Sequence, residues 1–252
     1  MKRPASGAGR DVASLRLAIA FLTIAPVRLR GEAPPLGAAA MWFPLVGALV
    51  GAVAGGAGWL AQPSLGSGVG AVLAVAVLVV LTGALHQDGL ADCADGLGAR
   101  GGDRDRRLAI MRDSSIGTFG ALALGLWLLL LVSALGGLGR DDAFYALVVA
   151  AATGRWAALL HAITTAPARR DGLGASFTIA IYPLGIATVI AAATAVGLEG
   201  TDGVAALVAA AAVASLVTLW ARRSLGGRTG DTLGATVALA EATVVLTLLG
   251  LS

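Results

Sequence analysis

Residues 68–86 read GVGAVLAVAVLVVLTGALH, a run of nineteen residues without a carboxylate, lysine or arginine. A helix needs about 20 mainly apolar residues to cross a bilayer, so this run predicts a transmembrane helix. Similar runs flank it, and together they predict about seven transmembrane helices, at 36–60, 68–86, 117–138, 142–165, 178–198, 203–221 and 232–251. The fold class expected is therefore all-α, a polytopic integral membrane helical bundle. Residues 12–26 are apolar but interrupted by Arg16, which favours an N-terminal interfacial helix.

The composition of the whole chain supports the same class. Of its 252 residues, 57% are hydrophobic and 13% are charged, whereas soluble domains carry about 25% charged residues. The mean hydropathy is +0.85. A water-soluble fold of this length could not bury so much apolar surface. The net charge of +3 would suit nucleic acid, but the basic residues follow the predicted membrane topology, so we expect a lipid bilayer as partner and no nucleic acid.

Lysine and arginine side chains are distributed unevenly about the predicted spans. Sixteen of the 18 fall in segments that alternate spans place on one side, Arg140 alone falls on the other side, and Arg155 lies inside a span. Because cytoplasmic loops are enriched in Lys and Arg, the N-terminus is predicted to be cytoplasmic, together with residues 87–115 and 222–231. No hydrophilic domain interrupts the pattern, so residues 1–252 are predicted to form a single membrane-embedded domain. Its Gly- and Ala-rich spans suit a homo-oligomer and packing within one chain equally well.

The longest polar stretch begins with QDGLADCADGLGA at residues 87–99, directly after the quoted run. It places Asp88, Asp92 and Asp95 at i, i+4 and i+7, along one face of a helix. Like charges so placed repel each other unless a cation binds, and His86 is the only basic side chain between 86 and 99. A solvated helix face would usually mix in Lys or Arg. The stripe therefore predicts catalytic carboxylates that ligate a divalent metal.

Substrate contacts are expected from groups around this stripe, at His86, Gly89, Arg100 and Arg112. The glycine would let a substrate approach the backbone, and arginine holds phosphate through two parallel hydrogen bonds. Most of the arginines between 100 and 112 are equally well explained as cytoplasmic anchors. Asp113, with the two serines after it, can cap the helix expected to follow, or ligate the metal, or do both.

A second polar cluster, GGRTGD at residues 226–231, opens the last predicted span from the same side. A glycine-rich turn before a helix offers free N–H groups to an anion. It is not a Walker A loop, because the Lys-Ser/Thr pair of that loop is missing. Asp231 is predicted either to cap the helix or to add a fifth metal-ligating carboxylate. The residues expected to bind substrate phosphates are Gly226, Gly227, Arg228, Thr229 and Gly230.

Two charged side chains, Arg155 and Glu241, stand inside predicted spans. Charges at bilayer depth are expensive and usually functional. Both lie near mid-depth at a rise of about 1.5 Å per residue, so we expect them to pair with each other. His161 is expected to be a polar packing residue. Cys93 is expected to be a small filler, because neighbouring carboxylates disfavour a thiolate.

These motifs resemble the cobalamin synthase family. The resemblance is carried by TGALHQDGLADCADGL at 82–97, IMRDSSIGTFG at 110–120, and GGRTGDTLGA at 226–235 with the later Glu241. FLTIAPV at 21–27 and ARRDGLGASF at 168–177 also resemble that family. Its members are adenosylcobinamide-GDP ribazoletransferases. The resemblance implies a multi-pass, inner-membrane enzyme of late coenzyme B12 synthesis in a bacterium or archaeon, with Mg²⁺ as cofactor.

The reaction implied by the resemblance moves the adenosylcobinamide phosphate moiety from adenosylcobinamide-GDP to the ribose hydroxyl of α-ribazole or α-ribazole 5′-phosphate. It releases GMP and forms adenosylcobalamin or its 5′-phosphate. One of the carboxylates would accept the hydroxyl proton. The metal ligands expected are Asp88, Asp92, Asp95, Asp113 and Asp231.

Two other classes of function stay open. One is a membrane phospholipid-type phosphotransferase, because the aspartate spacing faintly resembles that of the CDP-alcohol enzymes, although it departs from their full motif. The other is a polytopic transporter, which composition alone would allow. The polar residues gather on one side of the predicted membrane and are not distributed through the spans, and this favours an interfacial enzyme.

Overall fold

The structure is a computed structural model of the chain and describes residues 7–29, 32–99 and 101–252. Within these ranges every regular element is a helix, apart from an isolated bridge between Pro167 and Arg228. The helices, in chain order, are α1 (Gly7–Leu22), α2 (Leu36–Ala39), the 3-10 helix η1 (Ala40–Trp42), α3 (Phe43–Thr82), α4 (Leu85–Gly98), α5 (Arg104–Ile110), α6 (Thr118–Gly137), α7 (Arg140–Thr164), α8 (Leu173–Ser176), α9 (Ile181–Leu225) and α10 (Gly230–Leu249).

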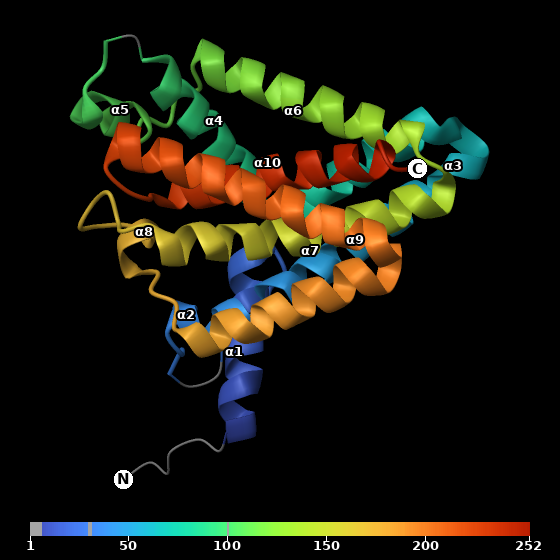
Figure 1. The fold of residues 1–252 in the computed structure, drawn as a ribbon, viewed down its shortest axis with the longest axis horizontal. Helices are drawn as coiled ribbons and strands as arrows, with labels where there is room; N and C mark the ends of the chain where they lie inside the picture. The colour runs from blue at the N-terminus through green and yellow to red at the C-terminus, as the bar shows by residue number, and fades with distance from the viewer. Residues whose placement is uncertain (1–6, 30–31, 100) are drawn as a thin grey trace.

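Five helical segments of the described chain are long and apolar enough to cross a membrane. They are the continuous run from α2 through α3, and α6, α7, α9 and α10. Figure 1 shows the long helices lying roughly alongside one another in a bundle, with α1 to one side. The predicted all-helical membrane class is therefore confirmed.

Helices α3 and α9 are too long for a single crossing. They hold 40 and 45 residues, which would extend about 60 Å and 68 Å at 1.5 Å per residue, against a hydrocarbon core of about 30 Å. Each is interrupted by a glycine with non-helical backbone angles, at Gly66 (φ 84°, ψ 164°) and Gly200 (φ 56°, ψ −126°). A positive φ suits glycine because it has no Cβ to collide with the backbone.

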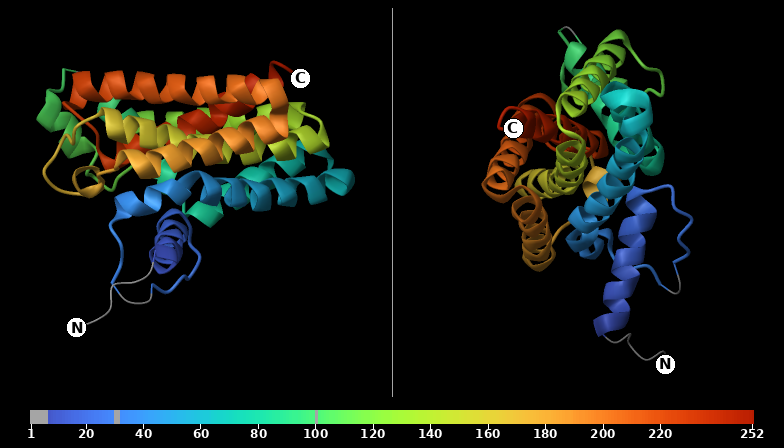
Figure 2. Two further views of the ribbon diagram at one scale, coloured as in Figure 1. Left: turned by 60° about the horizontal axis from the view of Figure 1, so that its bottom comes forward. Right: turned by 90° about the vertical axis from the view of Figure 1, so that its right-hand side faces the viewer.

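At both glycines the chain reverses, and the two arms touch each other beside the turn. In α3, a Cβ added to Gly58 would lie 2.7 Å from the carbonyl oxygen of Gly70. In α9, a Cβ on Gly203 would lie 2.2 Å from the carbonyl oxygen of Ala195, and Figure 2 shows the two arms of this helix joined at one end and diverging from there. The arms lie where the sequence predicted separate apolar segments.

Helix α7 occupies the centre of the bundle and packs against α3, α9 and α10 (Figure 1). Glycines on α3 let the two backbones approach closely. A Cβ on Gly47 would stand 2.3 Å from the carbonyl oxygen of Ala151, and one on Gly51 would stand 2.7 Å from that of Leu147. Small residues at helix contacts are the usual means of close packing in lipid, where dispersion contacts stabilise the bundle.

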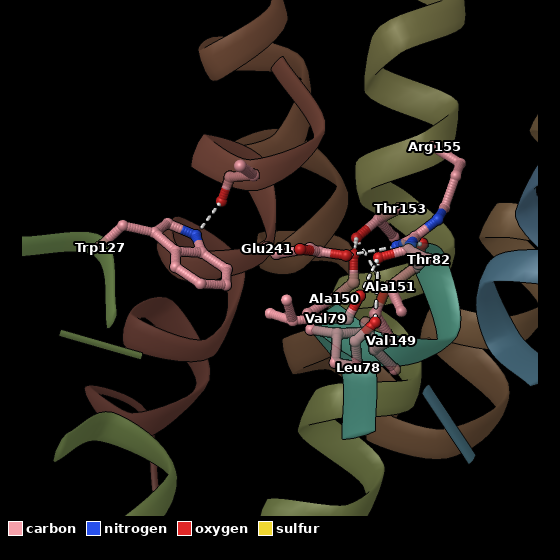
Figure 3. Close-up of polar contacts among 11 residues, drawn as sticks. Leu78, Val79, Thr82, Trp127, Val149, Ala150, Ala151, Thr153, Arg155 and Glu241 are labelled. Atoms are coloured by element: carbon pink, nitrogen blue, oxygen red, sulfur yellow. Dashed lines mark hydrogen bonds and ion pairs between the residues drawn. The ribbon is translucent and has the colours of Figure 1, made fainter. Parts of the chain in front are cut away.

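The charged pair expected inside the spans is present. Arg155 of α7 donates from Nη1 to Oε1 of Glu241 on α10, and to the carbonyl oxygen of Ala151 at 2.9 Å (Figure 3). The side chains of Arg155 and Glu241 are 1% and 0% exposed. Pairing offsets part of the large cost of burying two charges. The hypothesis that these residues pair is confirmed.

Helix α4 is a separate helix and does not continue α3. The apolar helix ends at Thr82, earlier than the predicted 86, and a left-handed pair, Gly83 (φ 59°) and Ala84 (φ 57°), turns the chain into α4. An L-residue in this conformation costs roughly 1–2 kcal/mol. The turn brings α4 between α6 and α10, where its aspartates meet residues from the other end of the sequence.

Candidate active site

The aspartate stripe lies on a helix, as predicted. Asp88, Asp92 and Asp95 all belong to α4. Asp88 is exposed, while Asp92 and Asp95 are half-buried. Cys93 and Leu90, on the other side of α4, are buried in the core. The helix therefore presents its carboxylates on one face and packs with the other.

Gly89 has a different role from the one expected. A Cβ there would lie 2.6 Å from the carbonyl oxygen of Asp231 and 3.1 Å from its Cα. The bare face of Gly89 is thus occupied by the first turn of α10, and substrate cannot use it. Gly234 of α10 packs the same contact, since its Cβ would stand 3.2 Å from the carbonyl oxygen of Leu85. This close approach carries Asp231 to the aspartate stripe.

Asp231 itself is half-buried beside the stripe. It does not cap α10, because Thr229 is the cap residue: its hydroxyl accepts from the Thr232 N–H at 3.2 Å, and the Thr232 hydroxyl accepts in return from the Thr229 N–H at 3.0 Å. The Thr229 hydroxyl also donates to Oδ2 of Asp231 at 3.1 Å. Two roles were predicted for Asp231, a helix cap and an additional metal-ligating carboxylate. Because Thr229 is the cap, only the second role remains as a prediction.

The convergence of carboxylates changes their chemistry. Burial, followed by the charges of Asp231, Asp88 and Asp95 in that order, raises the pKa of Asp92 from 3.8 to about 7, although the charge of Arg169 opposes this rise. A carboxyl with this pKa is in a site where negative charge is crowded and partly desolvated. Such a site favours a bound cation.

Asp95 is also a helix cap. Its two oxygens accept from the N–H groups of Gly117 and Gly120, both at 2.8 Å, and so hold the start of α6. The expectation that Asp113 caps this helix was wrong. Asp113 instead accepts from the N–H and the hydroxyl of Ser115, at 3.0 Å and 2.7 Å, in an exposed turn, and these bonds lower its pKa.

A cavity opens between these two aspartates. It has a volume of about 290 Å³ and is lined by α4, the end of α5 and the start of α6. Asp95, Asp113 and Ser115 face it together with Phe119. This volume is close to the lower end of the range of about 300–1,000 Å³ found for ligand pockets.

The glycine-rich turn before α10 is committed to packing. The N–H groups of Gly227 and Arg228 donate to the carbonyl oxygens of Ala221 (3.2 Å) and Ala166 (2.8 Å). Gly226, with φ 71°, ends α9 in the left-handed conformation, and its N–H also donates to Ala221. The expectation that Gly226, Gly227 and Thr229 offer free N–H groups to a phosphate is therefore corrected.

The expectation that Arg228 binds a substrate phosphate is corrected in the same way. Its side chain is buried, and its guanidinium donates to the carbonyl oxygens of Thr165 and Phe177, the latter at 2.8 Å. It holds the segment from 165 to 177 against the start of α10, in addition to the backbone hydrogen bonds from the Ala168 N–H to the Arg228 carbonyl and from the Arg228 N–H to the Ala166 carbonyl, both at 2.8 Å, which form the isolated bridge. Gly230 begins α10 and borders an apolar pocket.

Arg169 is the functional candidate that sequence reasoning missed. It is close enough to Asp92 to oppose the rise of that residue's pKa, and its guanidinium donates to the carbonyl oxygen of Leu108 at 3.0 Å. Arg112, a predicted substrate contact, instead forms an exposed ion pair with Asp171 at 2.7 Å. The only signal for Arg169 was its place in the ARRDGLGASF motif. Arg100 lies outside the described residues.

His86 is buried at the start of α4, with Nδ1 unpaired among the described residues. Burial, with a smaller contribution from the charge of Arg155, holds the pKa of this imidazole well below its usual range. The ring is therefore neutral. It faces the apolar pocket bordered by Gly230.

Among the described residues, no group of three His, Cys, Asp or Glu side chains is placed to hold a metal by itself. This arrangement still suits magnesium. Mg²⁺ is usually held by one or two carboxylates together with substrate phosphates and water. The oxygen donors of Asp88, Asp92 and Asp231, crowded at one edge of the bundle, are of the kind that Mg²⁺ prefers.

The fold and the site together define a helical membrane protein with a carboxylate centre shared by α4 and α10. The chain belongs to the cobalamin-5-phosphate synthase family, whose model matches residues 14–249. A relative from Roseiflexus sp. (strain RS-1) is 39% identical over 238 residues, covering 92% of this chain and 87% of the relative. A relative from Klebsiella pneumoniae subsp. pneumoniae is 42% identical over 217 residues, covering 82% of this chain and 85% of the relative. Both are named adenosylcobinamide-GDP ribazoletransferase. No solved structure matches the chain.

Proposed function

We propose that this protein is an adenosylcobinamide-GDP ribazoletransferase. The observation that carries the proposal is the family match over residues 14–249, which includes both halves of the carboxylate centre. In the reaction, a ribose hydroxyl oxygen of α-ribazole or its 5′-phosphate bonds to the phosphorus that bears the cobinamide. The bond from that phosphorus to the bridging oxygen of the diphosphate breaks, and GMP leaves. One carboxylate of the centre accepts the hydroxyl proton.

Each part of the centre has a proposed task. One or two of the carboxylates of Asp88, Asp92 and Asp231 would hold Mg²⁺ together with substrate phosphate and water, with Asp95 and Asp113 beside them at the cavity. When bound, Mg²⁺ neutralises charge on the diphosphate and on the leaving phosphate. Arg169 supports the nonbridging oxygens, because its guanidinium lies next to these carboxylates and carries a permanent positive charge. The Asp95 hydrogen bonds to α6 fix the wall of the cavity against the stripe.

We also propose seven membrane crossings, with the centre facing the cytoplasm at the inner membrane. The two broken helices supply two arms each, which together with α6, α7 and α10 give this number. The excess of Lys and Arg on one side of the predicted topology supports the orientation. α1, which lies outside the bundle (Figure 2), would be the interfacial helix.

The test is release of GMP from adenosylcobinamide-GDP by the purified protein, with and without α-ribazole and Mg²⁺. We expect release only when both are present. Release of CMP from a CDP-alcohol, or accumulation of a solute in vesicles without chemistry, would point to the other two classes. Asp88→Asn and Asp92→Asn should each abolish GMP release while membrane insertion stays intact. Near wild-type rates in both would disprove the proposed metal site.

A further inference from the structure

The cavity between Asp95 and Asp113 has no ligand assigned to it by the proposed metal chemistry. It lies at the end of the bundle where α4, α5 and the start of α6 meet (Figure 1). Its volume of about 290 Å³ is close to the lower end of the range for drug-sized ligands. The cavity therefore suits a planar bicyclic base with part of its sugar.

One wall of the cavity is aromatic. Phe119, in the first turn of α6, lines the cavity and is 49% exposed. A Cβ on Gly98 would overlap the Phe119 ring, so the absence of a side chain at Gly98 lets the ring pack directly on the end of α4. The rest of the ring is open to the cavity. Exposed aromatic rings of this kind bind nucleotide bases by stacking.

The two carboxylates at the cavity differ in their free hydrogen-bonding capacity. Each oxygen of Asp95 already accepts from a backbone N–H, that of Gly117 or that of Gly120. In Asp113, Oδ1 accepts both the N–H and the hydroxyl of Ser115, while Oδ2 has no hydrogen bond to any described residue. An ionised carboxylate can only accept, so a ligand beside Oδ2 must offer N–H or O–H donors.

The cavity adjoins the carboxylate centre along α4. Asp95 lines the cavity and follows Asp92 by three residues, a distance of about 4.5 Å along the helix axis on the same face. The two side chains are close enough for the charge of Asp95 to contribute to the raised pKa of Asp92. A nucleotide with its base in the cavity can therefore extend its phosphates along this face of α4 to the centre.

We infer that this cavity binds the guanine base of the nucleotide substrate and that Asp113 distinguishes guanine from adenine. The inference rests on the proposed function, which supplies adenosylcobinamide-GDP as a substrate. Guanine stacks on Phe119 and presents two adjacent donors, N1–H and N2–H, and the two lone pairs of Asp113 Oδ2 accept both. Adenine has an acceptor at N1, which would face the carboxylate and be rejected. The base of α-ribazole has no N–H donor, so the other substrate does not satisfy Asp113.

The experiment measures binding of GMP, IMP and AMP, in the presence of Mg²⁺, to the purified full-length protein in lipid nanodiscs. The wild type should bind GMP about tenfold or more tightly than AMP, with IMP between them because it lacks the 2-amino group. Asp113→Asn should weaken GMP binding about tenfold and leave AMP binding no weaker. The Ser115 donors retain the remaining oxygen of the new amide, so its NH₂ group replaces Oδ2 and opposes the donors of guanine.

The matched control is Asp105→Asn, which removes an exposed carboxylate of α5 that does not line the cavity. This variant should keep the wild-type preference for GMP. Phe119→Leu should weaken GMP and AMP binding alike, by about tenfold, because stacking does not discriminate between bases. Unchanged GMP affinity in Phe119→Leu would place the base outside the cavity and overturn the inference.

The ratio of GMP affinity to AMP affinity separates this role of Asp113 from two others. If Asp113 only ligated Mg²⁺, Asp113→Asn would weaken both nucleotides equally, and if it only repelled phosphate, the variant would bind both more tightly. Either result, or equal affinities of the wild type for GMP and AMP, would overturn the inference. A GMP preference that depends on Asp113, in a protein that never releases GMP from adenosylcobinamide-GDP, would overturn the proposed function and leave the guanine site standing.

Discussion

The contact between Gly89 and Asp231 gives the most specific prediction, because here the backbone of α10 lies directly against the helix that carries the aspartate stripe. Replacing Gly89 with alanine adds one methyl group and no charge. The new Cβ would stand 2.6 Å from the carbonyl oxygen of Asp231 and 3.1 Å from its Cα. Both atoms belong to the backbone, so no side chain can rotate to make room.

The size of the effect follows from these distances. Ordinary van der Waals contact begins at 3.4 Å, so the two helices must separate by about 0.8 Å at this point. Overpacking of this kind costs roughly 1–3 kcal/mol of stability. Misplacing catalytic groups by about 1 Å can cost on the order of 100-fold in rate. We therefore expect Gly89→Ala to remain folded and inserted, with GMP release reduced about 100-fold.

The assay is the initial rate of GMP release, measured beside thermal unfolding of the purified protein. Gly125 of α6 provides the control, because a Cβ there meets no atom within 4 Å. Gly125→Ala should keep the wild-type rate and lose no stability, since alanine favours a helix by up to about 1 kcal/mol over glycine. A wild-type rate in Gly89→Ala would refute the view that α10 completes the centre. A complete loss of folded protein would mean that the helices cannot separate by this small distance.

The remaining predictions concern three groups of charges. Arg155→Leu and Glu241→Leu should each destabilise the protein by roughly 3–5 kcal/mol, because one charge is left buried without its partner. The double variant should recover part of this lost stability, measured by thermal unfolding. A double variant no more stable than either single variant would contradict a stabilising role for the pair. Asp95→Ala should lower the melting temperature by an amount equivalent to about 0.5–2 kcal/mol, since it removes the cap of α6, whereas Asp113→Ala should have a smaller effect because its bonds are confined to an exposed turn. The pKa of Asp92 is raised from 3.8 to about 7 in the folded protein, so between these values the carboxyl holds its proton in the folded state and loses it in the unfolded chain. Metal-free protein should therefore lose stability as pH rises from about 4 to 7, and Asp92→Asn should lose less. A wild-type melting temperature that increases over this interval relative to that of Asp92→Asn would contradict the predicted direction.

Local patterns in the sequence predicted much of this protein. The length of the apolar runs gave the membrane class, and the spacing of Asp88, Asp92 and Asp95 gave their common helical face, because both depend only on helix geometry and hydropathy. The pairing of Arg155 with Glu241 was also predictable, since two charges at similar depth in lipid have few other partners. The roles of the capping residues were less accessible. Asp95 and Asp113 both precede α6, and the sequence favoured the nearer one.

The tertiary structure alone decided how the centre is assembled. Gly89 was expected to face a substrate and instead faces Asp231. The glycine-rich turn was expected to bind phosphate, but its N–H groups donate hydrogen bonds to carbonyl oxygens of the same chain. Arg169 entered the centre unpredicted. These outcomes depend on which segments of the folded chain approach one another, and hydropathy and helical periodicity carry no information about such contacts. The apolar run and the aspartates that follow it were thus determined locally, whereas Asp231 and Arg169 were brought to those aspartates by packing between distant helices.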